Sequence, residues 1–128
     1  MEIIKTITLL LSGLLLLFVG IMRLSNPVGT YLKNSGIKLD KDVNLLNEIR
    51  GVSAVQLLSS ICIIVGIFVT KLTVISFAIA SIVFIGFLIG RLTSIQVDGK
   101  PNKQIIQGLR FELLFGIANL FCLIYVLT

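Results

Sequence analysis

Four long apolar runs, separated by shorter polar segments, dominate the pattern of hydrophobic and polar positions along the chain. They cover residues 6–22, 51–70, 72–90 and 111–127. Each contains 17 to 20 residues, and a helix of that length reaches across about 30 Å of hydrocarbon. The pattern therefore predicts an all-α integral membrane protein, with residues 1–128 forming a single four-helix transmembrane bundle of antiparallel neighbours.

The polar segments predict where the helices turn. A single lysine separates the second run from the third, so these two runs must form a tight hairpin. In the long connection after the first run, Asn26-Pro27 and residues 34–36 are turn signals. Asp40 or Asp42 is placed to cap a helix that continues into the second run.

The segment "GRLTSIQVDGKP", residues 90–101, begins at the last residue of the third apolar run and contains the polar residues that follow it. If the helix continues past the membrane edge, Arg91, Ser94 and Asp98 share one face, because their spacing is i, i+3, i+7. Proline is favoured in the first turn of a helix, so Pro101 predicts that the fourth helix begins near Asn102.

Composition agrees with a membrane protein. The chain is 56% apolar and 13% charged, with a mean hydropathy of +1.08, whereas about a quarter of the residues of soluble domains are charged. The first run has spanning length, and no small-residue cleavage site precedes Arg23. We therefore expect a transmembrane helix there and not a signal peptide.

The distribution of Lys and Arg predicts the orientation. Of the 11 basic residues, only Lys5 and Lys71 lie on the side of the termini, and the other nine lie on the side of the two long connections. Cytoplasmic loops collect Lys and Arg, so the long loops are expected in the cytoplasm and both termini outside. The net charge of +5 then reports orientation, and no nucleic-acid partner is expected.

Helices in lipid associate through small residues and interhelical hydrogen bonds, since burying leucine out of lipid gains little. Six glycines are therefore predicted to mark close helix packing: Gly13, Gly20, Gly51, Gly86, Gly90 and Gly116. Gln56 and Asn119 lie deeper in the apolar runs, where each polar side chain needs a partner.

A polar cluster is predicted at the cytoplasmic helix ends, formed by Arg50, Arg91, Ser94, Asp98 and Glu112. An unpaired carboxylate is costly in apolar surroundings, so Glu112 is expected to pair with Arg50 or Arg91, or to be protonated. Two interpretations remain open. The cluster is either an ionic lock between helix ends or a pocket that binds an anionic headgroup or a small anion through its arginines.

Other chemistry has little support in the sequence. The chain has no histidine, and Cys62 and Cys122 belong to no CxxC motif, which argues against a metal site. The two cysteines are expected to be packing residues. No metal, cofactor or catalytic residue is predicted.

Three stretches resemble a known family: "IRGVSAVQ" at residues 49–56, "GRLTSIQVDGKP" at residues 90–101, and Glu112 at the start of the last span. Together they resemble the small four-helix bacterial membrane proteins of domain-of-unknown-function family 4345. The resemblance spans nearly the whole chain, and it implies a bacterial inner-membrane location and no particular activity. It carries over nine positions: Arg50, Gly51, Gly90, Arg91, Ser94, Asp98, Gly99, Pro101 and Glu112.

These features favour a small non-enzymatic membrane protein, either an accessory or scaffold subunit of a membrane complex or a lipid-interacting protein. Its partners would be membrane lipids, other membrane subunits or a second copy of the chain. One alternative is a small transporter, although its acidic residues lie near helix ends and not in mid-span. The other is an enzyme acting on a lipid phosphate or isoprenoid, with Asp98 or Glu112 as acid or base.

Overall fold

The computed structural model describes residues 1–128 and contains helices but no strands. The elements are α1 (Glu2–Ser25), α2 (Pro27–Ser35), α3 (Val43–Phe68), the 3-10 turn η1 (Thr70–Leu72), α4 (Thr73–Asp98) and α5 (Lys103–Leu127). The four helices other than α2 are long and apolar enough to cross a membrane. The predicted all-α fold with four candidate spans is confirmed.

The predicted helix starts are also found. Asp42 precedes α3, and its side chain accepts a hydrogen bond of 3.0 Å from the backbone N–H of Asn44. Asn102 precedes α5 and accepts a bond of 2.9 Å from the N–H of Ile105. Each acceptor satisfies a donor that the first helical turn leaves free. The hairpin between α3 and α4 consists of Val69 and η1.

The connection after the first span differs from the prediction, because it contains the helix α2. The side chain of Asn26 accepts from the N–H of Gly29 at 3.1 Å, and Pro27 takes the first helical position, where no N–H is required. Gly36 ends the helix with a φ of 65°, a conformation that glycine adopts without strain. The predicted turn signals are therefore the two caps of a short helix.

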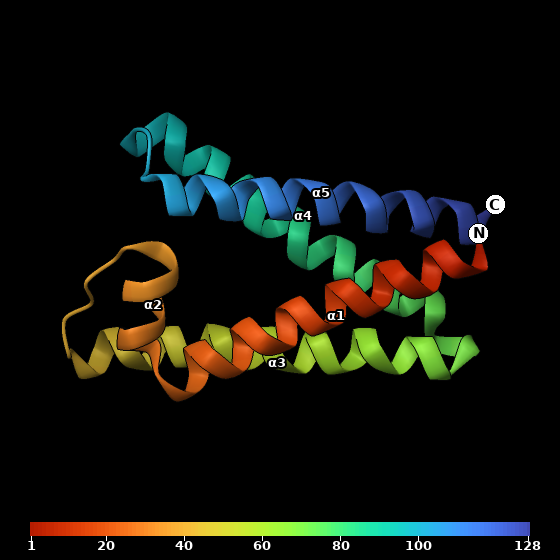
Figure 1. The fold of residues 1–128 in the computed structure, drawn as a ribbon, viewed down its shortest axis with the longest axis horizontal. Coiled ribbons are helices and arrows are strands. Elements are labelled where there is room, and N and C mark those ends of the chain that lie inside the picture. Colours follow the sequence, from red (N-terminus) through yellow and green to blue (C-terminus); the bar gives the residue numbers. More distant parts are fainter.

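The four long helices form two antiparallel pairs (Figure 1). α1 packs along α3, and α5 packs along α4, while α4 crosses from the end of α3 toward α5. Both termini and η1 lie at one end of the bundle, which we call the terminal end. α2 and the two longer connections lie at the opposite end, which we call the loop end.

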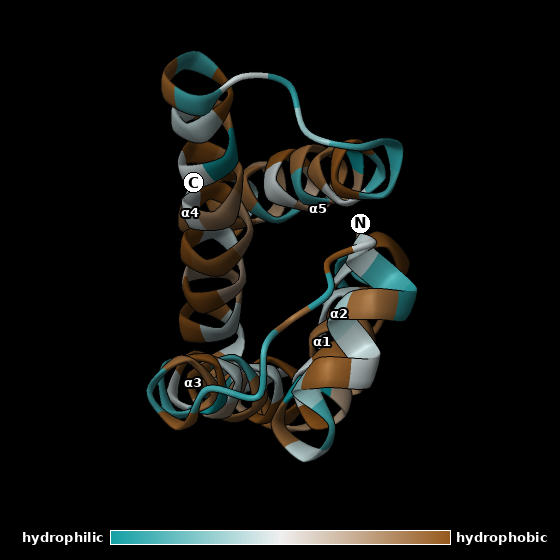
Figure 2. Cartoon of the chain, turned by 90° about the vertical axis from the view of Figure 1, so that its left-hand side faces the viewer, coloured by the Kyte–Doolittle hydropathy of each residue, from teal (hydrophilic) through white to brown (hydrophobic).

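The apolar core is concentrated in the half of the bundle near the terminal end. It consists of Leu9, Leu16, Ile63, Phe77, Ala80, Phe84 and Cys122. Leu9 and Leu16 come from α1, Ile63 from the second half of α3, and Cys122 from the last turns of α5. The other three core residues belong to the first half of α4. Toward the loop end the two helix pairs diverge, as the view from that end shows (Figure 2). The long helices are mostly apolar in the same view, and many of their large apolar side chains are exposed, as expected of segments that face lipid.

Three of the six glycines predicted to mark packing lie where helices touch. Gly13 faces Ile63 and Ile64 of α3. A Cβ atom on Gly20 would lie 3.1 Å from the backbone nitrogen of Leu57, and one on Gly116 would lie 3.1 Å from a side-chain carbon of Ile85. These positions bring α1 close to α3 and α5 close to α4.

The other three glycines do not pack against a neighbouring helix, which corrects the prediction. No atom lies within 4 Å of a Cβ built on Gly51, Gly86 or Gly90. In α3 the buried face instead runs through Ser53, Gln56, Ser60, Ile63 and Gly66. Serine hydroxyls on this face bond to carbonyls of their own helix, so they can be buried without a partner from another helix.

The two cysteines do not form a pair. Cys122 is buried, and Cys62 is exposed on the apolar outer surface, unlike the packing role expected for it. They lie on α3 and α5, which do not touch each other. A disulfide between them is therefore excluded in this fold.

Candidate functional site

Two adjoining cavities occupy the loop end, where the helix pairs diverge. The larger has a volume of about 580 Å³ and lies mainly between α3 and α4, and the smaller has a volume of about 300 Å³ and lies mainly between α1 and α5. We call them the large lobe and the small lobe of the loop-end cavity. Six residues line both lobes: Arg23, Ser35, Gln56, Phe87, Arg91 and Ile105.

Arg91 and Glu112 form the ion pair of this cavity. The Nε of Arg91 lies 2.8 Å from one carboxylate oxygen of Glu112 and 2.7 Å from the other. Glu112 is buried, with 11% of its side chain exposed, and Arg91 has 26% exposed. The contact ties α4 to α5 and compensates a carboxylate that would otherwise be expensive in this position.

Arg23, at the end of α1, supplies a second guanidinium group that the sequence reasoning did not assign to the site. It lies over the ring of Tyr31 at 4.9 Å from the ring centroid, a cation–π arrangement. No carboxylate pairs with it, and no carbonyl accepts a hydrogen bond from it. Arg23 lies one turn after Gly20, which is buried, and this spacing is the sequence signal that could have placed Arg23 on the inner face of α1.

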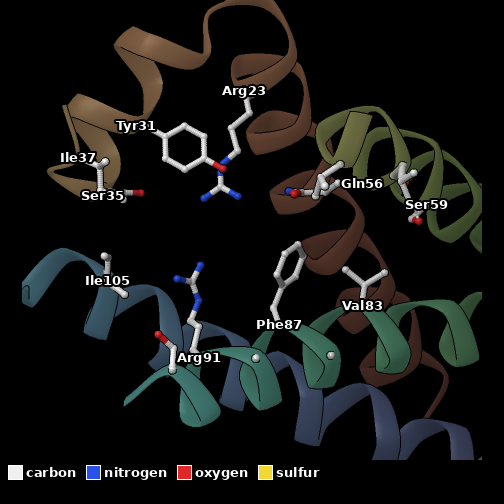
Figure 3. A pocket seen from close by; sticks show the side chains of 15 residues that line it. Arg23, Tyr31, Ser35, Ile37, Gln56, Ser59, Val83, Phe87, Arg91 and Ile105 are labelled. Carbon is white, nitrogen blue, oxygen red and sulfur yellow. Dashed lines mark hydrogen bonds between the residues drawn. The ribbon is translucent and has the colours of Figure 1, made fainter. Parts of the chain in front are cut away.

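The guanidinium groups of Arg23 and Arg91 point toward one another across the cavity (Figure 3). The ion pair to Glu112 uses only the Nε of Arg91, so the terminal Nη nitrogens of Arg91 have no acceptor within the chain. Arg23, Arg91 and Glu112 are the charged residues that line the two lobes. The cavity therefore carries an excess of one positive charge and several unused hydrogen-bond donors.

The walls of the large lobe are largely apolar. Val52 and Val55 of α3 line it together with Val83 and Phe87 of α4. Val52 and Val55 are also 56% and 66% exposed, so the lobe reaches the outer surface of the bundle between these two helices. Glycines at positions 86 and 90 line the same opening and add no side chain that would close it.

Each of the two intramembrane amides has a carbonyl oxygen without a partner, but their surroundings differ. The Nδ2 of Asn119 donates to the hydroxyl of Ser12 and to the carbonyl of Phe115, both at 2.8 Å. Gln56 is buried and lines both lobes, and its side chain points into the cavity (Figure 3). Its Oε1 has no hydrogen-bond partner, so this amide has hydrogen-bonding capacity that the chain itself does not use.

Two members of the predicted cluster lie outside the cavity. Arg50 is exposed and does not meet Glu112; its guanidinium donates to the carbonyl of Leu24, which the end of α1 leaves without a helical partner. Asp98 is exposed and accepts a hydrogen bond of 3.0 Å from Ser94. The structure thus places Arg91 and Glu112 together and Ser94 at the edge of the large lobe, but it separates Arg50 and Asp98 from them.

Helix α2 covers the cavity from the loop end, and two side chains from the start of α5 hold it there. Asn102 donates to the carbonyl of Ser35 at 2.8 Å, and Gln104 donates to the carbonyl of Lys33 at 2.9 Å. Both carbonyls belong to the last turn of α2, where no helical donor is available. These bonds link residues far apart in the sequence and bring Tyr31 and Ser35 over the cavity.

Comparison with known proteins identifies the family. Residues 4–123 match the family described as a domain of unknown function, DUF4345. The chain belongs to the DUF4345 family. This confirms the resemblance carried by the segments around Arg50, Arg91 and Glu112. No curated protein and no solved structure matches the chain. The description of the DUF4345 family gives no activity, so the chemistry of the site has to be argued from its residues.

Proposed function

We propose that this DUF4345 protein is a non-enzymatic membrane protein that binds an anionic lipid headgroup in the loop-end cavity. The proposal rests on the guanidinium groups of Arg23 and Arg91, which face each other across a cavity with largely apolar walls. The terminal nitrogens of both groups have N–H donors that form no hydrogen bond within the chain. The headgroup would lie between the two arginines.

Electrostatics favours an anion at this place. Two like charges that face each other in a partly buried site repel, and the repulsion is stronger in low dielectric than in water. Glu112 makes a direct ion pair with only one of them, through the Nε of Arg91. A phosphate or carboxylate group between Arg23 and Arg91 would remove the repulsion and accept charge-assisted hydrogen bonds from both.

The opening of the large lobe favours a lipid as the source of that anion. The lobe reaches the bundle surface between α3 and α4, beside the exposed Val52 and Val55. In a bilayer this surface faces hydrocarbon, so an acyl chain can enter sideways while its headgroup remains at the arginines. An apolar wall next to two cationic donors matches the two parts of an amphiphile.

The distribution of charge supports an inner-membrane protein with its loop end in the cytoplasm. Nine of the 11 basic residues lie in the segments 23–50 and 91–110 toward the loop end, and the other two are Lys5 and Lys71 at the terminal end. In this orientation the cavity lies at the headgroup level of the cytoplasmic leaflet, where anionic lipids attract basic segments.

Lipid analysis of the purified protein tests the proposal. The wild-type chain, Arg23→Gln and Arg110→Gln are purified in mild detergent, and the bound lipid is extracted and identified by mass spectrometry. Arg23 forms no ion pair, so its substitution leaves the Arg91–Glu112 contact in place. Arg110 is exposed and lines neither lobe, which makes it the matched control.

Wild type and Arg110→Gln are expected to retain anionic lipid in roughly stoichiometric amount, and Arg23→Gln to lose most of it. Equal lipid content in all three proteins would contradict binding at the arginine pair. A wild-type protein free of anionic lipid, even after incubation with it, would contradict the proposal as a whole.

A further inference from the structure

We infer that the ligand is a phosphodiester lipid whose headgroup carries free hydroxyl groups. This inference rests on the proposed function and adds the headgroup chemistry. Three observations carry it: the net charge of the cavity, the unused amide of Gln56, and the polar lining of the small lobe. A fatty acid or a lipid ending in a bare phosphate fits fewer of these observations.

The charge of the cavity matches a monoanion. Arg23 and Arg91 contribute two positive charges and Glu112 removes one, so one negative charge makes the site neutral. A phosphodiester carries one charge, whereas a phosphomonoester carries more than one at neutral pH. A dianion would leave an excess negative charge beside the buried carboxylate of Glu112.

Gln56 favours a ligand that also donates hydrogen bonds. The amide offers two donor hydrogens and one acceptor oxygen, and its Oε1 has no partner in the chain. Rotation of the amide about its last side-chain bond can present either group to the cavity. Phosphate oxygens satisfy the donors only, so the acceptor remains unpaired unless the ligand brings an O–H group.

The small lobe provides further neutral hydrogen-bonding groups. Besides Gln56 and Ser35, its wall contains the amides of Asn34, Gln104 and Gln107. Amides that both donate and accept are suited to hydroxyl groups, which do the same. Leu15, Phe84 and other apolar residues complete this wall and exclude bulk water from part of it.

These positions give one orientation for the ligand. The phosphodiester lies between Arg23 and Arg91, the hydroxylated headgroup extends into the small lobe toward Gln56, and an acyl chain leaves through the large lobe between α3 and α4. The six residues shared by the two lobes surround the point where the phosphate joins the two parts. Each part of the lipid thus contacts a part of the cavity wall that matches it in polarity and charge.

Native mass spectrometry with two matched lipids tests this inference. Phosphatidylglycerol and phosphatidylpropanol have the same charge and nearly the same size, but only the first carries headgroup hydroxyls. Delipidated wild type is expected to bind phosphatidylglycerol about tenfold more tightly, a ratio typical of one well-made hydrogen bond. Gln56→Leu is expected to bind the two lipids equally, and Arg23→Gln to bind neither.

The outcomes separate the two proposals. Equal binding of both lipids by wild type, or an unchanged preference in Gln56→Leu, overturns the hydroxyl inference while leaving anion binding intact. If Arg23→Gln binds the two lipids as tightly as wild type does, anion binding itself is overturned. If Gln56→Leu does not fold, Gln107→Leu replaces it, because Gln107 is exposed and forms no hydrogen bond in the chain. A reduced preference in that variant supports the inference, and an unchanged one contradicts it.

Discussion

Glu112 is the only carboxylate that lines the loop-end cavity. Both of its carboxylate oxygens accept a hydrogen bond from the Nε–H of Arg91, and the pair is partly shielded from solvent. Replacing Glu112 by Gln leaves a guanidinium without its countercharge. We expect this variant to lose about 1–3 kcal/mol of stability, seen as a lower midpoint of thermal unfolding in detergent by far-UV circular dichroism.

The control for this prediction is a double-mutant cycle with Arg91→Gln. If the two side chains stabilise each other, the double variant is less destabilised than the sum of the single variants by about 0.5–3 kcal/mol. Strict additivity would show that the ion pair does not tie α4 to α5. If Glu112→Gln has unchanged stability but loses coupled ion flux, Glu112 has a role in transport and not the structural role described above.

Sequence reasoning succeeded for some charged residues and failed for others, for one physical reason. Helical phase and the cost of a lone carboxylate led correctly to Arg91 and Glu112 as possible partners. It placed Arg50 in the same cluster because the inner face of α3 was assigned through Gly51, and that glycine is exposed. It overlooked Arg23 because a charge at the end of a span is ordinarily an orientation signal.

Among the elements, the contact between α1 and α3 is controlled by Gly20. A Cβ at this position would lie 3.1 Å from the backbone nitrogen of Leu57 and 3.2 Å from its Cα, and backbone atoms cannot move aside independently. Gly20→Ala is therefore expected to lower stability by about 1–3 kcal/mol through overpacking. Thermal unfolding of the purified protein measures the loss.

Gly90→Ala is the matched control, since it makes the same chemical change at an exposed helical glycine with no atom within 4 Å of the new Cβ. Its stability should equal that of wild type or exceed it by up to about 1 kcal/mol, because alanine is the better helix former. Equal destabilisation by the two substitutions would mean that the loss comes from helix chemistry and not from the α1–α3 contact.

The elements themselves were predicted better than their contacts. The four apolar runs, the cap at Asp42 and the start of α5 after Asn102 follow from local rules and are all present. The sequence did not predict α2, because this helix has only nine residues and contains no apolar run, even though Asn26 and Gly36 mark its two ends. Caps alone describe a turn and a short helix equally well until tertiary contacts select one.

The arrangement of the whole molecule was the part that local patterns did not contain. The angle at which α4 crosses from α3 to α5 decides whether the loop end is closed or hollow, and that angle depends on side chains from several helices at once. Gly86 and Gly90, predicted to close a helix contact, instead line the opening. The cavity is therefore a property of the assembled bundle.

Orientation in the membrane is a prediction at the same scale. Glu2→Cys and Lys38→Cys, each in a Cys62→Ser, Cys122→Ser background, are exposed to a membrane-impermeant maleimide in intact cells. The charge distribution predicts labelling of position 2 in intact cells and of position 38 only after the membrane is permeabilised. The reverse pattern would place the loop-end cavity in the outer leaflet.

Thermal stabilisation by an anionic lipid measures whether Arg23 and Arg91 bind a headgroup between them. A ligand present at 100 times its Kd stabilises the folded protein by about 2.7 kcal/mol, which circular dichroism detects as a rise in Tm. Phosphatidylglycerol is expected to raise the Tm of wild type and Arg110→Gln by several degrees and to leave that of Arg23→Gln unchanged. The same rise in all three proteins would contradict headgroup binding between these arginines.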